Sequence, residues 1–177
     1  LAILDWLHNF CTGPEIFLQG DTDAMVYPDN ALEFAEKRKG NRGVIWGLKW
    51  TGARVKRDGK WQLAQSNYMP MTYPEYCAGG AFFMSRDVPR RLLAVLKRNR
   101  PYFPIDDVFF TGILAEKAGL RRLKTPGIYM TEQLDLMRNC ECQRLLASFE
   151  YKGSEAIRTA WEEYRAAQRK CPSAWTA

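Results

Sequence analysis

Apolar and polar residues follow two different periods along this chain, which predicts an α/β fold. Apolar residues at helical spacing predict helices over residues 1–11, 28–40, 85–100, 106–119 and 154–170. Short runs rich in apolar and β-branched residues predict strands at 15–19, 43–50 and 81–84, and a strand or loop at 121–130. Helices that alternate with strands favour a mixed central sheet flanked by helices. No repeat, low-complexity tract or linker interrupts the pattern, so we expect one folded unit.

Within these elements the pattern also predicts which residues face the core. In helix 28–40 we predict Asp29 as N-cap, Gly40 as the end, and an inward face of Leu32, Phe34 and Ala35. Helix 85–100 has an apolar face made of Leu92, Leu93, Val95 and Leu96. Helix 154–170 has an apolar face made of Ile157, Ala160, Trp161, Tyr164 and Ala167. An Asp-Gly turn at 58–59 predicts a hairpin or meander over 44–66. The aromatic, proline-rich stretch 67–80 is expected to be an irregular loop, which either borders a cleft or simply covers the core.

Composition confirms a globular chain but narrows the function little. The hydrophobic fraction is 46% and the aromatic fraction 13%, which excludes a disordered protein. The net charge of +6 suits anionic ligands such as nucleotides, nucleic acid or a membrane surface. The arginines of 85–100 are better explained as a solvated helix face, because no aromatic residues are interleaved with them to stack on bases.

Cysteine and histidine usage excludes several enzyme classes. With one histidine, His8, and no CxxC pair, a mixed Cys/His zinc site and a Ser-His-Asp triad have little support. Neither a GxSxG motif nor a GxxxxGK[ST] phosphate loop occurs. The five cysteines fit either two disulfides and one free thiol in a secretory compartment, or five thiols in the cytosol.

Two pairs of aspartates are the candidate chemical groups. Asp21 and Asp23 follow a predicted strand, where they either form an ordinary Asp-rich turn or converge on a hard divalent cation. Asp106 and Asp107 follow Pro104 at a predicted helix start. Capping explains one aspartate there, and the second is a candidate general base if it faces a cleft.

Several motifs in a fixed order give these aspartates a context. An apolar strand leads into "GDTD", and then "VYPDN", "KW", "NYMPMTYPEYCAGGAFFMSRD" and "PIDDVFFTGILAEKAGL" follow. In this order and spacing the chain resembles glycosyltransferase family 31, the β1,3-galactosyltransferases and β1,3-N-acetylglucosaminyltransferases. The resemblance covers about residues 4–171.

The resemblance implies a fold, a reaction and a location. It implies a GT-A-type, Rossmann-like fold, with residues 1–177 as one partial catalytic domain that lacks the upstream strand and helix for the uridine base. It implies an inverting hexosyltransferase that moves galactose or N-acetylglucosamine from UDP-galactose or UDP-N-acetylglucosamine, with Mn²⁺ (or Mg²⁺), in β1,3 linkage. The acceptor would be a glycan on a glycoprotein or glycolipid, and nucleic acid would not be a partner. The family consists of type II proteins of the Golgi membrane with lumenal catalytic domains, so an anchor upstream of this chain is expected.

Site residues also follow from the resemblance. Asp21, Thr22 and Asp23 match the family's DxD motif, with Asp23 as main metal ligand and Asp21 supporting the ribose or the metal shell. Asp107 matches the general base, which takes a proton from the acceptor hydroxyl. The expected donor and acceptor contacts are Asp21, Thr22, Trp61, Tyr76, Gly79, Gly80 and Asp106.

Two residues depart from the family pattern. Thr22 replaces the usual middle aspartate, which should be tolerated because that side chain need not touch the ion. Glu150 stands where many members have a metal-reaching histidine, so we expect it as a third metal ligand. Its extra negative charge beside a diphosphate implies either an altered metal preference or a lost activity. The alternative interpretation is therefore a catalytically silent carbohydrate- or nucleotide-binding domain of the same fold. A third interpretation, which rests on the net charge alone, is a nucleic-acid-binding domain.

Overall fold

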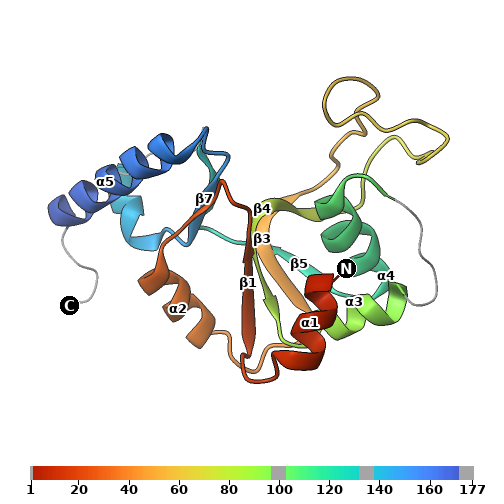
Figure 1. The fold of residues 1–177 in the computed structure, drawn as a ribbon, viewed down its shortest axis with the longest axis horizontal. Helices are drawn as coiled ribbons and strands as arrows, with labels where there is room; N and C mark the ends of the chain where they lie inside the picture. Colours follow the sequence, from red (N-terminus) through yellow and green to blue (C-terminus); the bar gives the residue numbers. More distant parts are fainter. Residues whose placement is uncertain (1, 97–102, 132–137, 172–177) are drawn as a thin grey trace.

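The computed structural model describes residues 2–96, 103–131 and 138–171, and within them the strands form two mixed sheets (Figure 1). The larger sheet has the order β1-β4-β3-β5, made of β1 (Ile16–Gly20), β4 (Tyr76–Ser85), β3 (Val44–Trp50) and β5 (Arg121–Lys124). The smaller has the order β2-β7-β6, made of β2 (Met25–Val26), β7 (Ala147–Phe149) and β6 (Ile128–Met130). In the larger sheet β4 is antiparallel to both neighbours and β5 is parallel to β3. The predicted mixed α/β architecture is confirmed.

Helices cover the larger sheet on one face, and one helix with the smaller sheet covers the other (Figure 1). On the first face lie α1 (Ala2–Phe10), α3 (Val88–Leu96), the π-helix η1 (Val108–Leu114) and α4 (Ala115–Lys117). On the second face α2 (Pro28–Glu36) packs beside β7. The remaining helices, η3 (Arg138–Arg144) and α5 (Ser154–Lys170), pack against a separate apolar cluster that includes Tyr27 and Tyr164.

Strand β4 is the centre of this arrangement because both of its faces are buried. Phe82 belongs to the cluster under α1 and α3, while Phe83 belongs to the cluster under α2. Successive side chains of a strand point to opposite faces, so a strand covered on both sides needs a continuous apolar run. The run "AFFM" at 81–84 meets this requirement, which explains why the sequence predicted a strand there.

The structure corrects the predicted face and cap of α2. Leu32 is 66% exposed, whereas Ala31 and Phe34 are buried and Ala35 is half-buried. Tyr27 occupies the N-cap position, and Asp29 lies in the first turn, where its charge still favours the helix N-terminus. A nine-residue helix with Pro at its start presents a narrower buried stripe than the predicted thirteen-residue pattern. On α5, Trp161 likewise remains 37% exposed and Ile157 is half-buried, whereas the rest of the predicted face is buried: Ala160, Tyr164 and Ala167.

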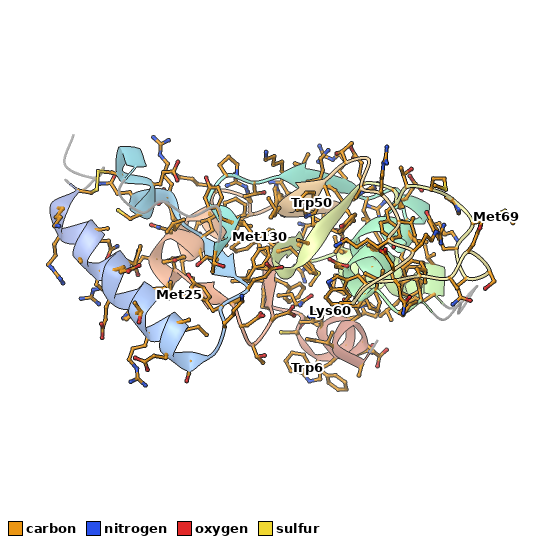
Figure 2. All side chains as sticks on the ribbon, turned by 90° about the horizontal axis from the view of Figure 1, so that it is seen from above. Trp6, Met25, Trp50, Lys60, Met69 and Met130 are labelled. Atoms are coloured by element: carbon orange, nitrogen blue, oxygen red, sulfur yellow. A yellow bond between two sulfur atoms is a disulfide. The ribbon has the colours of Figure 1, made fainter. Side chains whose placement is uncertain are left out.

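The predicted hairpin over 44–66 is wrong, and the loop predicted over 67–80 ends earlier. β3 pairs with β4 and β5, while residues 51–75 leave the sheet as an excursion that bonds to itself, for example at the Arg54–Thr72 bridge. The Asp-Gly turn at 58–59 lies inside this excursion. β4 begins at Tyr76, opposite Trp50, so residues 76–80 are strand. Met69 lies at the far end of the excursion and is 77% exposed (Figure 2).

One disulfide joins the end of α5 to η3, so the structure matches neither of the two cysteine patterns considered from the sequence. Cys140 and Cys171 are bonded, while Cys11, Cys77 and Cys142 are free. The bond ties the first residue after α5 to η3, beside the buried Cys142. None of the helices described here is long and apolar enough to cross a membrane.

Candidate active site

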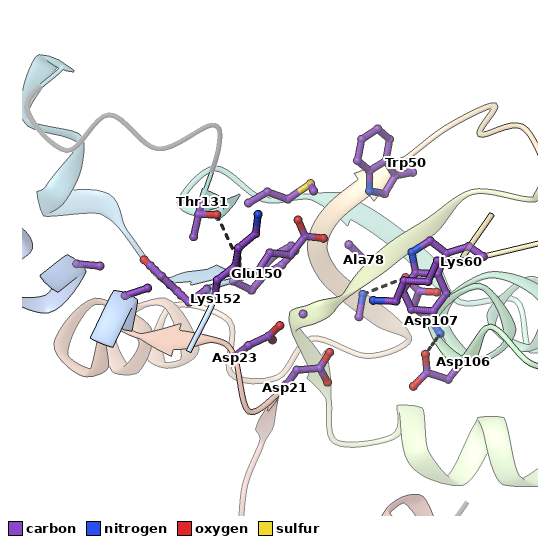
Figure 3. Close-up of a pocket in the computed structure, with 18 of the residues that line it drawn as sticks. Asp21, Asp23, Trp50, Lys60, Ala78, Asp106, Asp107, Thr131, Glu150 and Lys152 are labelled. Atoms are coloured by element: carbon purple, nitrogen blue, oxygen red, sulfur yellow. Dashed lines mark hydrogen bonds between the residues drawn. The ribbon is translucent and has the colours of Figure 1, made fainter. Parts of the chain in front are cut away.

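A cleft of about 1870 Å³ opens beside the start of β4 and collects the predicted aspartates on opposite sides (Figure 3). The turn after β1 and the residues around Glu150 form one side. The start of η1 and the 51–75 excursion form the other side. Residues of α5 complete the lining of the cleft. Segments from the whole length of the described chain therefore build one site.

The turn after β1 is fixed through its backbone, which leaves both of its carboxylates facing the cleft. The Asp21 N–H donates to the Gly80 carbonyl at 3.0 Å, and the Tyr151 N–H donates to the Asp23 carbonyl at 3.3 Å. Both side chains are exposed, and among the described residues their one side-chain hydrogen bond is a long 3.4 Å bond from the Gln19 amide to Asp21. Partial burial, followed by the charges of Asp106 and Asp23, raises the pKa of Asp21. The acidic groups are therefore close enough to repel one another, and a bound cation would relieve that repulsion.

Asp107 is held differently, because both of its carboxylate oxygens accept backbone hydrogen bonds. The Val108 N–H donates to Oδ1 at 2.7 Å and the Gly79 N–H donates to Oδ2 at 3.1 Å. Burial raises the pKa of Asp107; the two amides oppose this, the Asp106 charge adds to it, and the net shift is upward. A carboxylate that is oriented in this way and has a raised pKa is suited to accept a proton.

Thr111, which the sequence analysis did not single out, fastens the helix that carries Asp107 to β4. Its buried hydroxyl accepts from the Cys77 N–H at 2.9 Å and lies 2.8 Å from the Cys77 carbonyl and 2.7 Å from the Asp107 carbonyl, either of which it can donate to. A lone hydroxyl within the apolar run "VFFTGIL" is the signal that could have pointed to it. The backbone of Asp107 is therefore positioned from the strand as well as from its own helix.

Gly79 and Gly80 are glycines because the site leaves no room for a side chain. A Cβ on Gly80 would lie 2.2 Å from the ring of Phe149, and a Cβ on Gly79 would lie 3.2 Å from the Asp107 Cβ. Within the chain, the neighbours that come close to these two residues are Phe149 and Asp107. Their predicted contact with donor or acceptor stays a prediction. Through two neighbouring residues, β4 holds Asp107 by the Gly79 N–H and Asp21 by the Gly80 carbonyl.

Nearly all predicted site residues meet in this cleft. Its lining includes Asp21, Asp23, Trp61, Tyr76, Gly79, Gly80, Asp106, Asp107 and Glu150. Thr22 is exposed on the same turn but does not line the cleft. Burial raises the pKa of Tyr76 to about 12, so this residue is a neutral hydrogen-bonding group near neutral pH.

Glu150 lies on the same side of the cleft as the other predicted metal ligands, Asp21 and Asp23, without completing a set of three (Figure 3). Its backbone has a positive φ of 73°, and the Thr131 hydroxyl donates to its carbonyl at 3.4 Å. In the part of the chain that the structure describes, no three His, Cys, Asp or Glu side chains form a group that could hold a metal ion. Asp21 and Asp23 would therefore need ligands from a substrate or from water to complete a coordination shell.

Several cleft residues were not predicted from the sequence. They are Trp50 at the end of β3, three cations on the excursion, and polar residues on α5: Arg54, Lys56, Lys60, Glu155, Thr159, Glu163 and Lys170. They come from three parts of the chain, and only the fold brings them to the aspartates.

Comparison with known proteins assigns the family. A family model described as galactosyltransferase matches residues 1–126. The chain belongs to the galactosyltransferase family. This confirms the resemblance seen in the motifs. The match ends before β6, β7 and α5, so Glu150 lies outside the matched residues.

Curated relatives of this galactosyltransferase-family chain are named β1,3-glycosyltransferases. The human acetylgalactosaminyl-O-glycosyl-glycoprotein β-1,3-N-acetylglucosaminyltransferase is 34% identical over 122 residues, which cover 68% of this chain and 31% of the relative. The human N-acetyllactosaminide β-1,3-N-acetylglucosaminyltransferase 4 is 32% identical over 129 residues, covering 72% and 34%. The β-1,3-galactosyltransferase bre-2 of Caenorhabditis elegans is 28% identical over 128 residues, covering 68% and 35%. The chain thus spans about a third of the length of the curated relatives that it matches.

Proposed function

We propose that the protein carrying this chain is an inverting β1,3-glycosyltransferase, which moves galactose or N-acetylglucosamine from a UDP-sugar to a glycan acceptor. The observation that carries the proposal is the opposition of two carboxylate sites across one cleft, in a family whose relatives are named for this reaction. We propose a GT-A-type arrangement on the same grounds, with the acidic turn directly after a strand of the central sheet.

The acidic turn is the proposed place for a divalent metal ion. Asp21 and Asp23 both face the cleft with weakly bonded carboxylates, and oxygen ligands of this kind suit Mn²⁺ or Mg²⁺. Diphosphate oxygens and water would fill the rest of the shell, since the described residues include no group of three ligands that could hold a metal ion. When bound, the ion would neutralise charge on the diphosphate leaving group. Glu150 is proposed as an outer neighbour of this shell rather than a preassembled ligand.

Asp107 is the proposed general base. The Val108 and Gly79 amides orient its carboxylate, while its raised pKa favours uptake of a proton. The acceptor oxygen forms a bond to the anomeric carbon as its proton passes to Asp107. The bond from that carbon to the diphosphate oxygen breaks at the same time, and UDP leaves with the electron pair. A single displacement of this kind inverts the anomeric carbon and needs no covalent nucleophile.

The test is release of UDP from each of the two UDP-sugars, measured with and without Mn²⁺, chelator and a β-galactoside acceptor. We expect release that requires both metal and acceptor, with a β1,3-linked product identified by NMR. Metal-dependent binding of the UDP-sugar without turnover on any of a panel of acceptors would contradict the proposal and favour the silent binding domain. The departure at Glu150 is the reason to include Mg²⁺ as a second metal.

A Golgi location is proposed for the same protein, with its catalytic part in the lumen and its membrane anchor upstream of this chain. The Cys140–Cys171 disulfide supports this, because disulfides persist in the secretory pathway and are rare in the cytosol. Immunofluorescence of the tagged full-length protein against a Golgi marker tests the location. Diffuse cytosolic staining would contradict it.

A further inference from the structure

The side of the cleft next to Asp107 presents three cations to the solvent-filled space. Arg54, Lys56 and Lys60 all come from the 51–75 excursion and all line the cleft. Within the described residues, none of the three forms an ion pair with a carboxylate. The Lys60 ammonium instead lies 4.6 Å from the ring centroid of Trp61, which is 51% exposed. A group of unpaired cations facing a cleft is suited to an anionic ligand.

The excursion holds these cations in place, because it is folded rather than loosely connected. Arg57 lies between Lys56 and Lys60 in the sequence but points inward. It donates hydrogen bonds to the carbonyls of Leu63, Tyr68 and Pro70 at 2.7, 3.0 and 2.9 Å. Val55, between two of the cations, packs in a small core with Leu63, Tyr73 and Val108. Alternation along this segment therefore buries Val55, half-buries Arg57 and leaves Arg54, Lys56 and Lys60 exposed.

The same small core places the three cations beside the proposed acceptor position and away from the proposed diphosphate site. Val108 directly follows the proposed base, so the excursion is packed onto the helix that carries Asp107 and not onto the acidic turn. Figure 3 shows Lys60 on the side of the cleft that carries Asp106 and Asp107, across from Asp21 and Asp23. The proposed diphosphate site is at the acidic turn, whereas the hydroxyl that is deprotonated must lie at Asp107. The cations therefore flank the acceptor position.

We propose that the excursion recognises an anionic acceptor, by binding a carboxylate or sulfate group on the glycan with Arg54, Lys56 and Lys60. This deepens the proposed function and rests on it, because the acceptor position is defined by Asp107. Guanidinium and ammonium groups donate charge-assisted hydrogen bonds to both kinds of anion. Trp50 and Trp61 line the same space and offer apolar faces beside the charges.

The test compares matched acceptors on the purified full-length protein. The probes are an aryl β-galactoside, its 6-sulfated form and an aryl β-glucuronide, and each is measured both by calorimetric binding and as an acceptor. The variant Arg54→Gln/Lys56→Gln/Lys60→Gln removes the three cations. The control Lys39→Gln/Arg90→Gln/Lys117→Gln removes the same charge from exposed residues outside the cleft. UDP binding is measured for each protein.

We expect at least one anionic probe to bind about tenfold more tightly than the neutral probe, with the gain lost in the cleft variant and kept in the control. The gain should also shrink between about 50 mM and about 500 mM salt. The sulfated and carboxylated probes separate the two sources of negative charge. Turnover without any preference for an anionic probe would overturn this inference and leave the proposed function standing. Anion-selective binding without turnover would overturn the proposed function and leave the three cations as an anion-binding group. Weaker UDP binding in the cleft variant would assign the cations to the donor and overturn this inference.

Discussion

The two acidic sites of the cleft contain the same side chain in opposite surroundings. Asp21 and Asp23 are exposed, and the turn holds them by backbone contacts to Gly80 and Tyr151. Asp107 is half-buried, and both of its oxygens accept amide hydrogen bonds. An exposed, weakly bonded carboxylate can move onto an incoming cation, while a half-buried and oriented one is better suited to accept a proton. The surroundings of the carboxylates, and not the residue type, therefore distinguish the proposed metal ligands from the proposed general base.

The largest effect is expected from Asp107→Asn, which keeps the shape of the side chain and removes its basicity. Loss of a general base should lower turnover by about 10²–10⁴-fold. Asn retains one acceptor for Val108 and loses the bond to Gly79, while it avoids a buried charge, so the free energy of unfolding should change by only about 1 kcal/mol. Turnover and chemical denaturation measure the two quantities. An equal loss of turnover in Asp106→Asn would remove the distinction between the two neighbours.

On the exposed side, Asp23→Ala should weaken metal-dependent binding of UDP by about 100-fold or more, with little change in stability. The reason is that its carboxylate faces the cleft and makes no bond that the fold depends on, whereas its backbone contact to Tyr151 is retained. Calorimetry with UDP, with and without Mn²⁺, measures the effect. Thr22→Ala on the same turn is the matched control, and a comparable loss there would mean that the turn and not the carboxylate is required.

The strand between the two sites is tested by Gly80→Ala. The added Cβ would meet the Phe149 ring at 2.2 Å, so β4 or β7 must shift, and we expect the free energy of unfolding to fall by about 1–3 kcal/mol. Gly13→Ala is the control, because nothing lies within 4 Å of the Cβ position there. Equal unfolding midpoints for the two variants would contradict the packing described here.

Thr111→Val tests whether the strand positions the base. The substitution leaves the Cys77 N–H and carbonyl without their partner, which costs about 1–3 kcal/mol, and it frees the backbone of Asp107. We expect a fall in kcat with a smaller change in KM, and partial rescue by Thr111→Ser. A loss of stability without any change in kcat would show that Thr111 supports only the fold.

The smallest effect concerns pH. Since burial raises the pKa of Asp107, turnover should fall on acidification at a higher pH than an ordinary aspartate would give. Stability changes in the opposite sense, because a group with a raised pKa in the folded protein costs stability as pH rises from the ordinary value through the raised one. Thermal unfolding from acid to neutral pH should show this slope in the wild type, and Asp107→Asn should lack it. Identical slopes in the two proteins would contradict the pKa shift.

Local sequence patterns predicted most helices and strands, and the order of motifs led to the acidic residues. The α5 boundaries and the central run of β4 follow from periodicity and continuous apolarity, which depend on near neighbours alone. What the pattern missed depends on pairing across the chain. Tyr76 is strand because Trp50 lies opposite it, although the proline-rich stretch before it is typical of a loop. Leu32 is exposed because the core contacts only a narrow stripe of α2.

The same reason explains the missed parts of the site. The partners of Thr111 are residues 77 and 107, and the disulfide joins residues 31 positions apart, so neither follows from local composition. In the sequence alone, Arg54, Lys56 and Lys60 are typical of a solvated segment. Their position at the cleft follows only from the packing of the excursion against Val108.

The attachment of both acidic sites to Gly79 and Gly80 has a consequence for how this site can diversify. Gly79 and Gly80 are neighbouring residues of one strand, so β4 anchors Asp107 and Asp21 from adjacent positions. The 51–75 excursion contributes to neither of these two hydrogen bonds. Under the proposed function, insertions and exchanges in the excursion would therefore change which acceptor is bound and leave both anchors in place. A one-residue insertion within β4 before Gly79, by contrast, would move both anchors at once.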